Sequence, residues 1–296
     1  AYIALHGDSL LSVPSDERRK TLAAYALPIN LQRIQEGLTK YGIEYDVWFS
    51  EKSLYENGDV ADTLGWLKEN GFTVEKEGAL WLSGEKTGLE KDEVLVRANG
   101  FPTYMAADIA YHRNKLQVRK FDWAIDLWGA DHHGHVARMH AAMAPFGVKK
   151  EQLEIVLFQL VRLYRNGEIA RMSKRTGKAI SLLDLLDEVG RDAARFFFNL
   201  KTAGSHLDFD LDLAVKQSNE NPVFYVQYAH ARISNILRRL REEDGVTLLP
   251  VDQVDLSVLT AAEETALMRK LADYPEEVAI AAKGLEPSRL TRYVMD

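Results

Sequence analysis

The apolar run from Trp123 to Trp128, together with the polar loop and the helix-forming segment behind it, constrains the fold of this chain most. A run with so few polar residues is typical of a strand in a parallel sheet that is buried on both faces. The loop, residues 129–135, has the sequence Gly-Ala-Asp-His-His-Gly-His, and a helix is expected to continue towards Ala144. The order strand, loop, helix predicts an α/β domain that binds its ligands at the carboxyl ends of the strands.

The residues before this run predict a helix and a further strand. Apolar side chains recur at spacings of four and three between Leu27 and Leu38, and we expect Ser15 to cap this helix and Pro28 to kink or restart it. Apolar and acidic side chains alternate over most of residues 43–49, which predicts a strand that ends at Glu51.

Two domains are expected along the chain. Short apolar runs separated by turn dipeptides predict a small β insertion, and helical periodicity dominates the C-terminal third. We place the boundary after residue 214, so that residues 1–214 form the α/β domain and residues 215–296 form a helical domain. The expected elements are strands at 72–74, 79–82, 94–97 and 154–158, a helix from Tyr104 to Leu116, helices alone from about 181 onward with Ser181 and Asp184 as a capping box, and a long helix that starts at Asn221-Pro222.

The composition excludes several classes of protein. The 296 residues contain no cysteine, which rules out a disulfide scaffold, a cysteine nucleophile and a cysteine-bound zinc or iron–sulfur site, and fits a reducing cytoplasm. No apolar run approaches the roughly 20 residues that a membrane-spanning helix needs. The net charge of −7 argues against a general nucleic-acid coat but leaves room for a local basic face.

Two loops carry polar patterns that suit a nucleotide. Residues 171–178 hold four cations, and such a loop can clamp a polyphosphate through a lysine and backbone N–H groups, the alternative being a solvated basic turn. In the loop 129–135, Gly129 allows a ligand to approach closely, Asp131 can accept from ribose hydroxyls, and His132 and His135 stand where a helix start favours anions. A metal site built from these histidines and Asp131 is the alternative.

An acidic pocket is predicted from three residues. Tyr104 and Asp108 lie one helix turn apart, and Glu51 could join them to form a pocket that a phenol lines. Carboxylates beside a planar ring suit a guanidinium, because the fork of its N–H groups matches carboxylate oxygens. The alternative is that Asp108 pairs with Arg113 or faces solvent.

The helix that follows Pro222 carries basic side chains among aromatic ones. Tyr225 and Tyr228 can stack on bases while Arg232 and Arg239 pair with phosphates, a combination that suits single-stranded RNA. The alternative is a solvated helix face, balanced by the acidic residues at 242–244.

Together these residues resemble the class I aminoacyl-tRNA synthetases, and within that class the arginyl enzymes. Residues 171–175, Arg-Met-Ser-Lys-Arg, resemble the Lys-Met-Ser-Lys-Ser loop of the class, with departures at both ends that are common in the arginyl branch. Longer stretches of arginyl type occur in family order at 45–51, 102–112, 128–135 and 221–232. The resemblance implies a partial Rossmann-like catalytic domain with a small β insertion, followed by a helical anticodon-binding domain.

The resemblance also implies an activity and its residues. Such enzymes join L-arginine to tRNA(Arg) through arginyl-adenylate, using ATP with Mg²⁺ and no dedicated protein metal site. We expect a cytoplasmic monomer without a membrane partner. Position 132 is often glutamine in relatives. The implied site residues are Met172, Ser173 and Lys174 for catalysis, Gly129, Asp131, His132 and His135 for ATP and adenylate, Glu51, Tyr104 and Asp108 for arginine, and Tyr225, Tyr228, Arg232 and Arg239 for tRNA.

One signature of the class, His-x-Gly-His, is expected outside this sequence. Residues 132–135 fit the string, but they lie too close to Ser173, and behind the arginine-pocket positions, to be that signature. We expect the signature to precede Ala1 and the anticodon-binding domain to continue past Asp296. This chain alone is therefore expected to be inactive.

Two other functions fit parts of the sequence. Asp131-His132-His133 resembles the metal-binding string of DHH-type phosphoesterases, although no Asp-x-Asp pair follows an early strand. A non-catalytic RNA-binding module derived from a synthetase is the second alternative.

Overall fold

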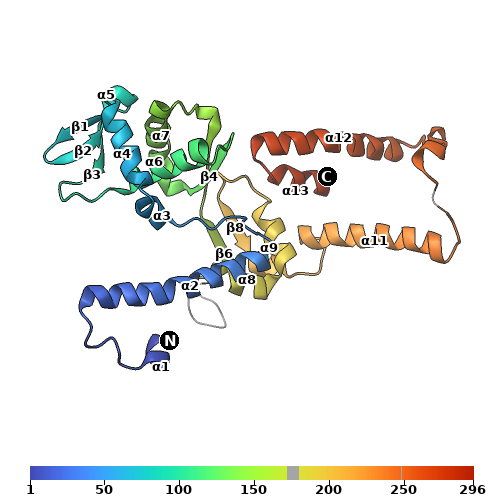
Figure 1. The fold of residues 1–296 in the computed structure, drawn as a ribbon. Helices are drawn as coiled ribbons and strands as arrows, with labels where there is room; N and C mark the ends of the chain where they lie inside the picture. Colours follow the sequence, from blue (N-terminus) through green and yellow to red (C-terminus); the bar gives the residue numbers. More distant parts are fainter. Residues whose placement is uncertain (172–179, 248) are drawn as a thin grey trace. The chain divides into compact units, whose positions relative to one another are not determined.

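A computed structural model describes residues 1–171, 180–247 and 249–296, and Figure 1 shows the helices and strands along the chain. The chain divides into two compact units, each assembled from segments that are distant in sequence. The first unit comprises residues 1–46, 161–202 and 207–296, and the second comprises residues 47–160 and 203–206. Within the described residues, no helix combines the length and the apolar character that crossing a membrane requires.

The second unit combines a small antiparallel sheet with a parallel strand pair and its helices. In the antiparallel sheet, β2 lies between β1 and β3, and Glu77 and Gly78 turn the chain between β1 and β2 with positive φ angles. This sheet confirms the predicted β insertion. The main elements are α3 (Glu51–Glu56), α4 (Asp59–Glu69), β1 (Thr73–Lys76), β2 (Ala79–Leu82), α5 (Gly84–Thr87), β3 (Glu93–Val96), α6 (Tyr104–Arg113), the π-helical turn η1 (Asn114–Val118), β4 (Ala124–Gly129), the 3-10 turn η2 (Ala130–His132), α7 (His133–Met143), the 3-10 turns η3 (Ala144–Phe146) and η4 (Lys150–Gln152), and β5 (Leu153–Phe158).

The core of the second unit gathers around α6. Ile109 of α6, Met139 of α7 and Leu153 of β5 are fully buried in one cluster. Because α6 also contacts α3, α4 and β3, it is packed on several sides. This packing fixes the helix that carries two of the predicted site residues.

The strand β4 pairs in parallel with β5, with Ala124 beside Leu153 and Gly129 beside Phe158. The predicted order of strand, polar loop and helix is therefore confirmed. The expected burial of this strand on both faces is wrong, since Ile125 is 40% exposed and Leu127 is 63% exposed. Successive side chains of a strand point to opposite faces, and within the described residues only one face of β4 is covered.

The predicted strand between Ile43 and Phe49 is wrong. Residues 43–50 have no regular secondary structure, and Val47 and Trp48 are exposed. Phe49 is partly buried, and its ring stacks on that of Tyr111 with the centroids 4.5 Å apart. The alternating apolar and acidic residues therefore do not form a strand, and the ring of Phe49 packs against Tyr111 instead.

The first unit joins helices to a three-stranded sheet of order β7-β6-β8. Because β8 pairs in parallel with β6, the expectation of helices alone after residue 181 is wrong. Phe209 of β8 is fully buried, and its ring packs against those of Phe197 and Phe198. The elements are α1 (Tyr2–His6), α2 (Ser15–Tyr41), β6 (Val161–Arg165), β7 (Glu168–Ile169), α8 (Leu182–Val189), α9 (Arg191–Phe198), β8 (Leu207–Asp210), α10 (Leu211–Ala214), α11 (Pro222–Glu242), the 3-10 turns η5 (Val251–Gln253) and η6 (Leu256–Val258), α12 (Ala262–Gly284) and α13 (Ser288–Met295).

Helix starts in the first unit test the capping predictions. Ser181 and Asp184 form the predicted reciprocal capping box at the start of α8, and Asn221 caps α11 through the backbone N–H of Val223. Ser15 is not a cap, since it is already the first residue of α2. This helix also continues through Pro28 without restarting, because a proline removes only one backbone donor from a long helix.

Candidate functional site

The predicted arginine-binding residues lie on two helices that contact each other, α3 and α6. Glu51 is the first residue of α3 and does not end a strand as predicted. The fully buried Leu54 anchors this short helix in the core. Glu51 itself is exposed, so its carboxylate is available to a ligand.

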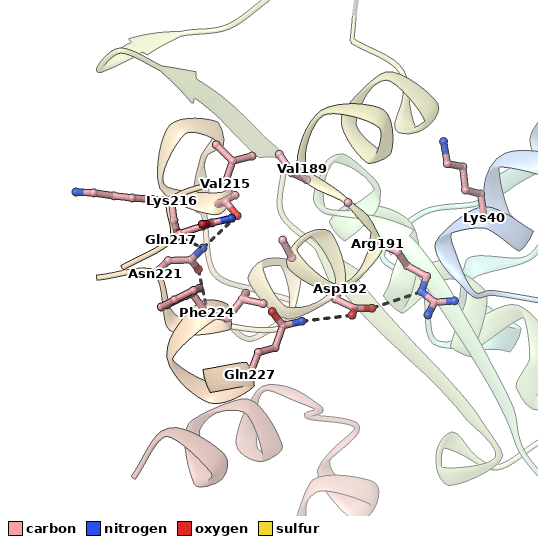
Figure 2. A pocket seen from close by; sticks show the side chains of 14 residues that line it. Lys40, Val189, Arg191, Asp192, Val215, Lys216, Gln217, Asn221, Phe224 and Gln227 are labelled. Atoms are coloured by element: carbon pink, nitrogen blue, oxygen red, sulfur yellow. Dashed lines mark hydrogen bonds and ion pairs between the residues drawn. The ribbon is translucent and has the colours of Figure 1, made fainter. Parts of the chain in front are cut away.

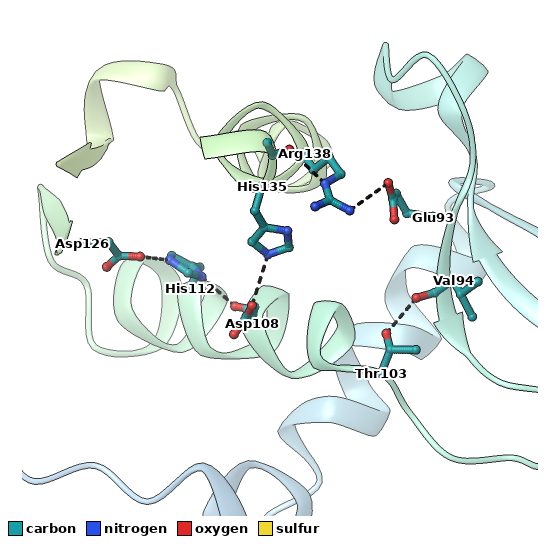
Figure 3. A network of polar contacts seen from close by, with 9 residues as sticks. Glu93, Val94, Thr103, Asp108, His112, Asp126, His135 and Arg138 are labelled. Atoms are coloured by element: carbon teal, nitrogen blue, oxygen red, sulfur yellow. Dashed lines mark hydrogen bonds and ion pairs between the residues drawn. The ribbon is translucent and has the colours of Figure 1, made fainter. Parts of the chain in front are cut away.

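The start of α6 sets the place of Tyr104 and Asp108. Thr103 precedes the helix and is tied to β3, because its hydroxyl donates to the carbonyl of Val94 over 2.7 Å (Figure 3). Tyr104 is 80% exposed, and the carboxylate of Asp108 is half-exposed. Arg113 donates to Thr63 and Gln117, and within the described residues it makes no ion pair with Asp108.

Tyr55 is a member of this group that sequence reasoning missed. Burial raises the pKa of the Tyr55 phenol, and the nearby charges of Glu51 and Asp108, with the Tyr104 phenol, raise it further. Glu51, Tyr104 and Asp108 therefore all lie near enough to Tyr55 to influence its pKa. The spacing of four residues between Glu51 and Tyr55 on α3 was the signal available in the sequence.

The segment after β4 brings one predicted nucleotide-binding residue, His135, against α6. His135 lies in the first turns of α7, and its Nε2 is 3.3 Å from Oδ2 of Asp108 (Figure 3). The rings of His135 and Trp128 lie with their centroids 5.4 Å apart. The structure thus joins a residue predicted to select arginine to a residue predicted to bind adenylate.

Asp131 and His132 of the same loop lie in more exposed surroundings than His135. Asp131 and His132 are exposed, and Nε2 of His132 lies 3.8 Å from Oδ2 of Asp131. A Cβ atom at Gly129 would lie 2.5 Å from Oδ1 of Asp131, so the absence of a side chain at Gly129 is what leaves room for this carboxylate. Within the residues that the structure describes, no three histidine or acidic side chains gather as a metal site would require.

Polar contacts beside the site, one of them buried, were also missed from the sequence. His112 of α6 contacts Asp126 of β4, and Lys115 contacts the same carboxylate over 2.7 Å. On the other side of α7, Arg138 reaches Glu93 of β3 over 3.3 Å (Figure 3). The available signal was Asp126, the only acidic residue in an otherwise apolar strand.

The remaining predicted residues lie in the first unit or outside the described residues. Met172, Ser173 and Lys174 belong to the segment 172–179, which the structure does not describe. The four predicted RNA-binding residues lie on α11, where all are exposed. One of them, Arg239, donates to Glu243 over 3.0 Å. This pair agrees with the alternative that part of this helix is a solvated face balanced by acidic residues.

A separate hollow of about 650 Å³ lies in the first unit between α9 and α11 (Figure 2). Its wall includes Asn221, whose side-chain amide donates to the carbonyls of Ala214 and Lys216. The cations that line it have acidic partners, since Lys40 pairs with Asp187, Arg191 with Asp192 and Lys216 with Glu220. These charges are balanced, and we assign no ligand to this hollow.

A nucleotide-type loop at the carboxyl end of a parallel strand, in a chain that continues into long helices, is the organisation of a class I aminoacyl-tRNA synthetase. Comparison with protein families agrees. Residues 20–234 match the family described as tRNA synthetases class I (R), catalytic domain, and residues 226–296 match the DALR anticodon binding domain. The chain belongs to the arginyl-tRNA synthetase family.

Relatives and solved structures support this assignment. The chain is 66% identical over 296 residues to a protein of Acetivibrio thermocellus and 64% identical over 295 residues to one of Ruminiclostridium cellulolyticum, both named arginine–tRNA ligase. Each match covers 100% of this chain and 52% of the relative, so the chain spans about half the length of these proteins. A solved structure from Campylobacter jejuni is 33% identical with a TM-score of 0.84 and covers 99% of this chain and 62% of that one. The arginyl-tRNA synthetase of Thermus thermophilus, at 24% identity and a TM-score of 0.77, shares the fold over 100% of this chain and 59% of its own.

Proposed function

We propose that the chain carries the arginine-selecting and adenylate-binding parts of an enzyme that joins L-arginine to tRNA(Arg). One observation supports this above the others: the side chains of Asp108 and His135 meet at 3.3 Å. In the proposed reaction, arginine and ATP must lie side by side, because a carboxylate oxygen of arginine attacks the α-phosphate. A contact between a guanidinium-selecting residue and an adenylate-binding residue is what such a site needs.

Arginine selection would rest on charge and shape. The guanidinium is planar, always charged, and presents N–H groups that pair with carboxylate oxygens two at a time. Glu51 and Asp108 supply such oxygens from α3 and α6, and Tyr104 supplies an exposed aromatic face. Tyr55 adds a second phenol near the carboxylates, whose charges raise its pKa.

ATP, brought with its Mg²⁺, would bind at the loop after β4. Gly129 and Asp131 offer close approach and an acceptor for ribose hydroxyls, and His132 and His135 stand at the start of α7, where helix N–H groups favour anions. Lys174, with its neighbours Met172 and Ser173, would stabilise the charge that builds on pyrophosphate; these residues lie outside the described part of the chain.

The proposed reaction has two steps. In the first, the arginine carboxylate forms a bond to the α-phosphorus and the bond to pyrophosphate breaks, giving arginyl-adenylate. In the second, a terminal ribose hydroxyl of tRNA(Arg) takes the arginyl group and AMP leaves. The protein contributes position and charge stabilisation to both steps.

RNA would be bound by the helical region that starts after residue 214. Tyr225, Tyr228, Arg232 and Arg239 are exposed on one helix, α11, which carries both aromatic and cationic side chains. This arrangement suits base stacking and phosphate pairing. We propose a cytoplasmic monomer; no observation favours a DHH-type phosphoesterase or a non-catalytic RNA-binding module.

The test is calorimetric binding of arginine, with citrulline and lysine as matched ligands. Citrulline has nearly the shape of arginine but no charge, and lysine has the charge but not the planar fork. We expect arginine to bind, lysine to bind more weakly and citrulline to bind least. Equal binding of arginine and citrulline, or no binding of arginine, would overturn the roles of Glu51 and Asp108.

A further inference from the structure

His112 is a buried titratable residue that the proposed function does not use. Its side chain is 3% exposed, and it lies one helix turn after Asp108 on α6. Nδ1 is 2.7 Å from the carbonyl oxygen of Asp108, and Nε2 is 2.5 Å from Oδ2 of Asp126 on β4 (Figure 3). The imidazole therefore bridges the helix of the arginine pocket and the strand that leads to the nucleotide loop.

The partners of the ring determine where its protons are. A backbone carbonyl can only accept a hydrogen bond, so Nδ1 must carry a hydrogen. Burial raises the pKa of Asp126, but the hydrogen bonds and charges of His112 and Lys115 outweigh burial and bring this pKa to about 2. Asp126 is therefore an ionised acceptor at neutral pH, and Nε2 must also carry a hydrogen. A ring that donates from both nitrogens is an imidazolium.

We propose that His112 is a positioning residue for arginine recognition: as a buried imidazolium it ties the backbone of Asp108 to Asp126, and so holds the Asp108 carboxylate against His135. This proposal rests on the proposed function for the identity of the ligand. The carboxylate of Asp108 also approaches β4 through His135, whose ring lies beside that of Trp128, whereas the link through His112 holds the backbone of Asp108. Loss of either donor would remove this link between the backbone of Asp108 and the strand, while Lys115 would still contact Asp126.

The charge of the imidazolium is part of the arrangement. Asp126, 8% exposed, receives hydrogen bonds from His112 and from Lys115, whose ammonium also lies 4.3 Å from the centre of the Tyr111 ring. A buried carboxylate with two charged donors is stable, whereas either partner alone would be an uncompensated buried charge. The titratable or charged groups around the ring and its two partners are Asp108 and Tyr111 of α6, Lys115 of η1, Asp126 of β4, and His135 and His140 of α7.

Two measurements test the proposal. The first is an NMR spectrum of the wild-type chain labelled with ¹⁵N at its 8 histidines, recorded at pH 7.5, with the His112 signals assigned from their loss in His112→Gln. We expect both ring nitrogens of His112 to carry slowly exchanging hydrogens. A ring with one protonated nitrogen at this pH would overturn the proposal, and this readout needs only the wild-type fold once its signals are assigned.

The second measurement is arginine affinity in a double-mutant cycle. We expect His112→Gln to weaken arginine binding about tenfold or more, because its amide cannot replace both donors, while His140→Gln leaves the affinity unchanged. If His112 acts through Asp108, the variant carrying both His112→Gln and Asp108→Asn should bind no more weakly than Asp108→Asn alone. Circular dichroism would confirm that each variant is folded.

The outcomes separate the two proposals. Additive losses in the cycle, or an unchanged affinity in a folded His112→Gln variant, would overturn the positioning role and leave the proposed function intact. A wild-type chain that does not bind arginine would overturn the proposed function together with the positioning role. A doubly protonated His112 in that same chain would then show that the failure lies in ligand assignment and not in the ring's protonation.

Discussion

Nε2 of His135 lies 3.3 Å from Oδ2 of Asp108, which places the first turns of α7 against the middle of α6. His135 is mostly buried and Asp108 is half-exposed, so the contact lies at the floor of the site. One carboxylate oxygen of Asp108 faces the histidine. A guanidinium bound as proposed would share Asp108 with His135, and this makes the charge of Asp108 the first property to test.

Asp108→Asn should weaken arginine binding about tenfold to a hundredfold, because a hydrogen bond between charged groups contributes roughly 1.5–3 kcal/mol. Calorimetry on the variant and the wild-type chain measures this change. Glu69→Gln, which removes an exposed carboxylate at the end of α4, is the matched control and should bind arginine normally. Equal losses in both variants would mean that only the net charge matters.

Gly129→Ala should weaken ATP binding without lowering stability appreciably. The φ of Gly129 is −65°, which any residue adopts, but the new Cβ would lie 2.5 Å from Oδ1 of Asp131 and push that exposed carboxylate away. Binding of a fluorescent ATP analogue and urea unfolding would be measured together. Gly134→Ala on α7 meets no atom within 4 Å and should bind the analogue normally.

Asp126→Asn should destabilise the chain by about 3 kcal/mol at neutral pH, because it leaves Lys115 and the buried His112, which both contact this carboxylate, without an anionic partner. The folded-state pKa of Asp126, about 2, lies below its ordinary value of 3.8. Its ionised form therefore stabilises the fold above pH 3.8, and that contribution, about 2 kcal/mol, is lost as the pH falls towards 2.

The measurement for Asp126 is urea unfolding followed by circular dichroism between pH 2 and pH 7. The stability difference between wild type and variant should shrink as the pH falls through this range. Asp208→Asn is the control, because Asp208 pairs with Arg162 at an exposed site and should cost no more than about 1 kcal/mol. A pH-independent difference for Asp126→Asn would contradict the lowered pKa.

Features set by local chemistry could be predicted from the sequence. The Ser181 and Asp184 capping box spans three residues, and the spacing of Tyr104 and Asp108 on one helix follows from α-helical geometry. The strand β4 and its loop were also found, since an apolar run followed by glycine and polar residues is a local signal.

Features set by distant partners could not be predicted. Strand β8 forms because it pairs with β6, which lies more than forty residues earlier, and four residues in a helical region give no sign of this. The alternation before Glu51 looked like a strand but finds no strand to pair with among the described residues. The bond between His112 and Asp126 joins two elements, so no single periodicity contains it.

In the region that matches the DALR domain, Arg289 should prove important for holding α13 to α12. Its guanidinium donates to both carboxylate oxygens of Glu277 over 2.9–3.1 Å, and both side chains are about one-third exposed. Arg289→Lys should lower stability by about 1 kcal/mol, because an ammonium keeps the charge but cannot reproduce the paired geometry. Glu277→Gln should have a similar effect, and Glu276→Gln, exposed on the same helix, should have none. Hydrogen exchange of the α13 amides measures the effect locally. Unchanged exchange in Arg289→Lys would mean that the charge alone, and not the paired geometry, joins the two helices.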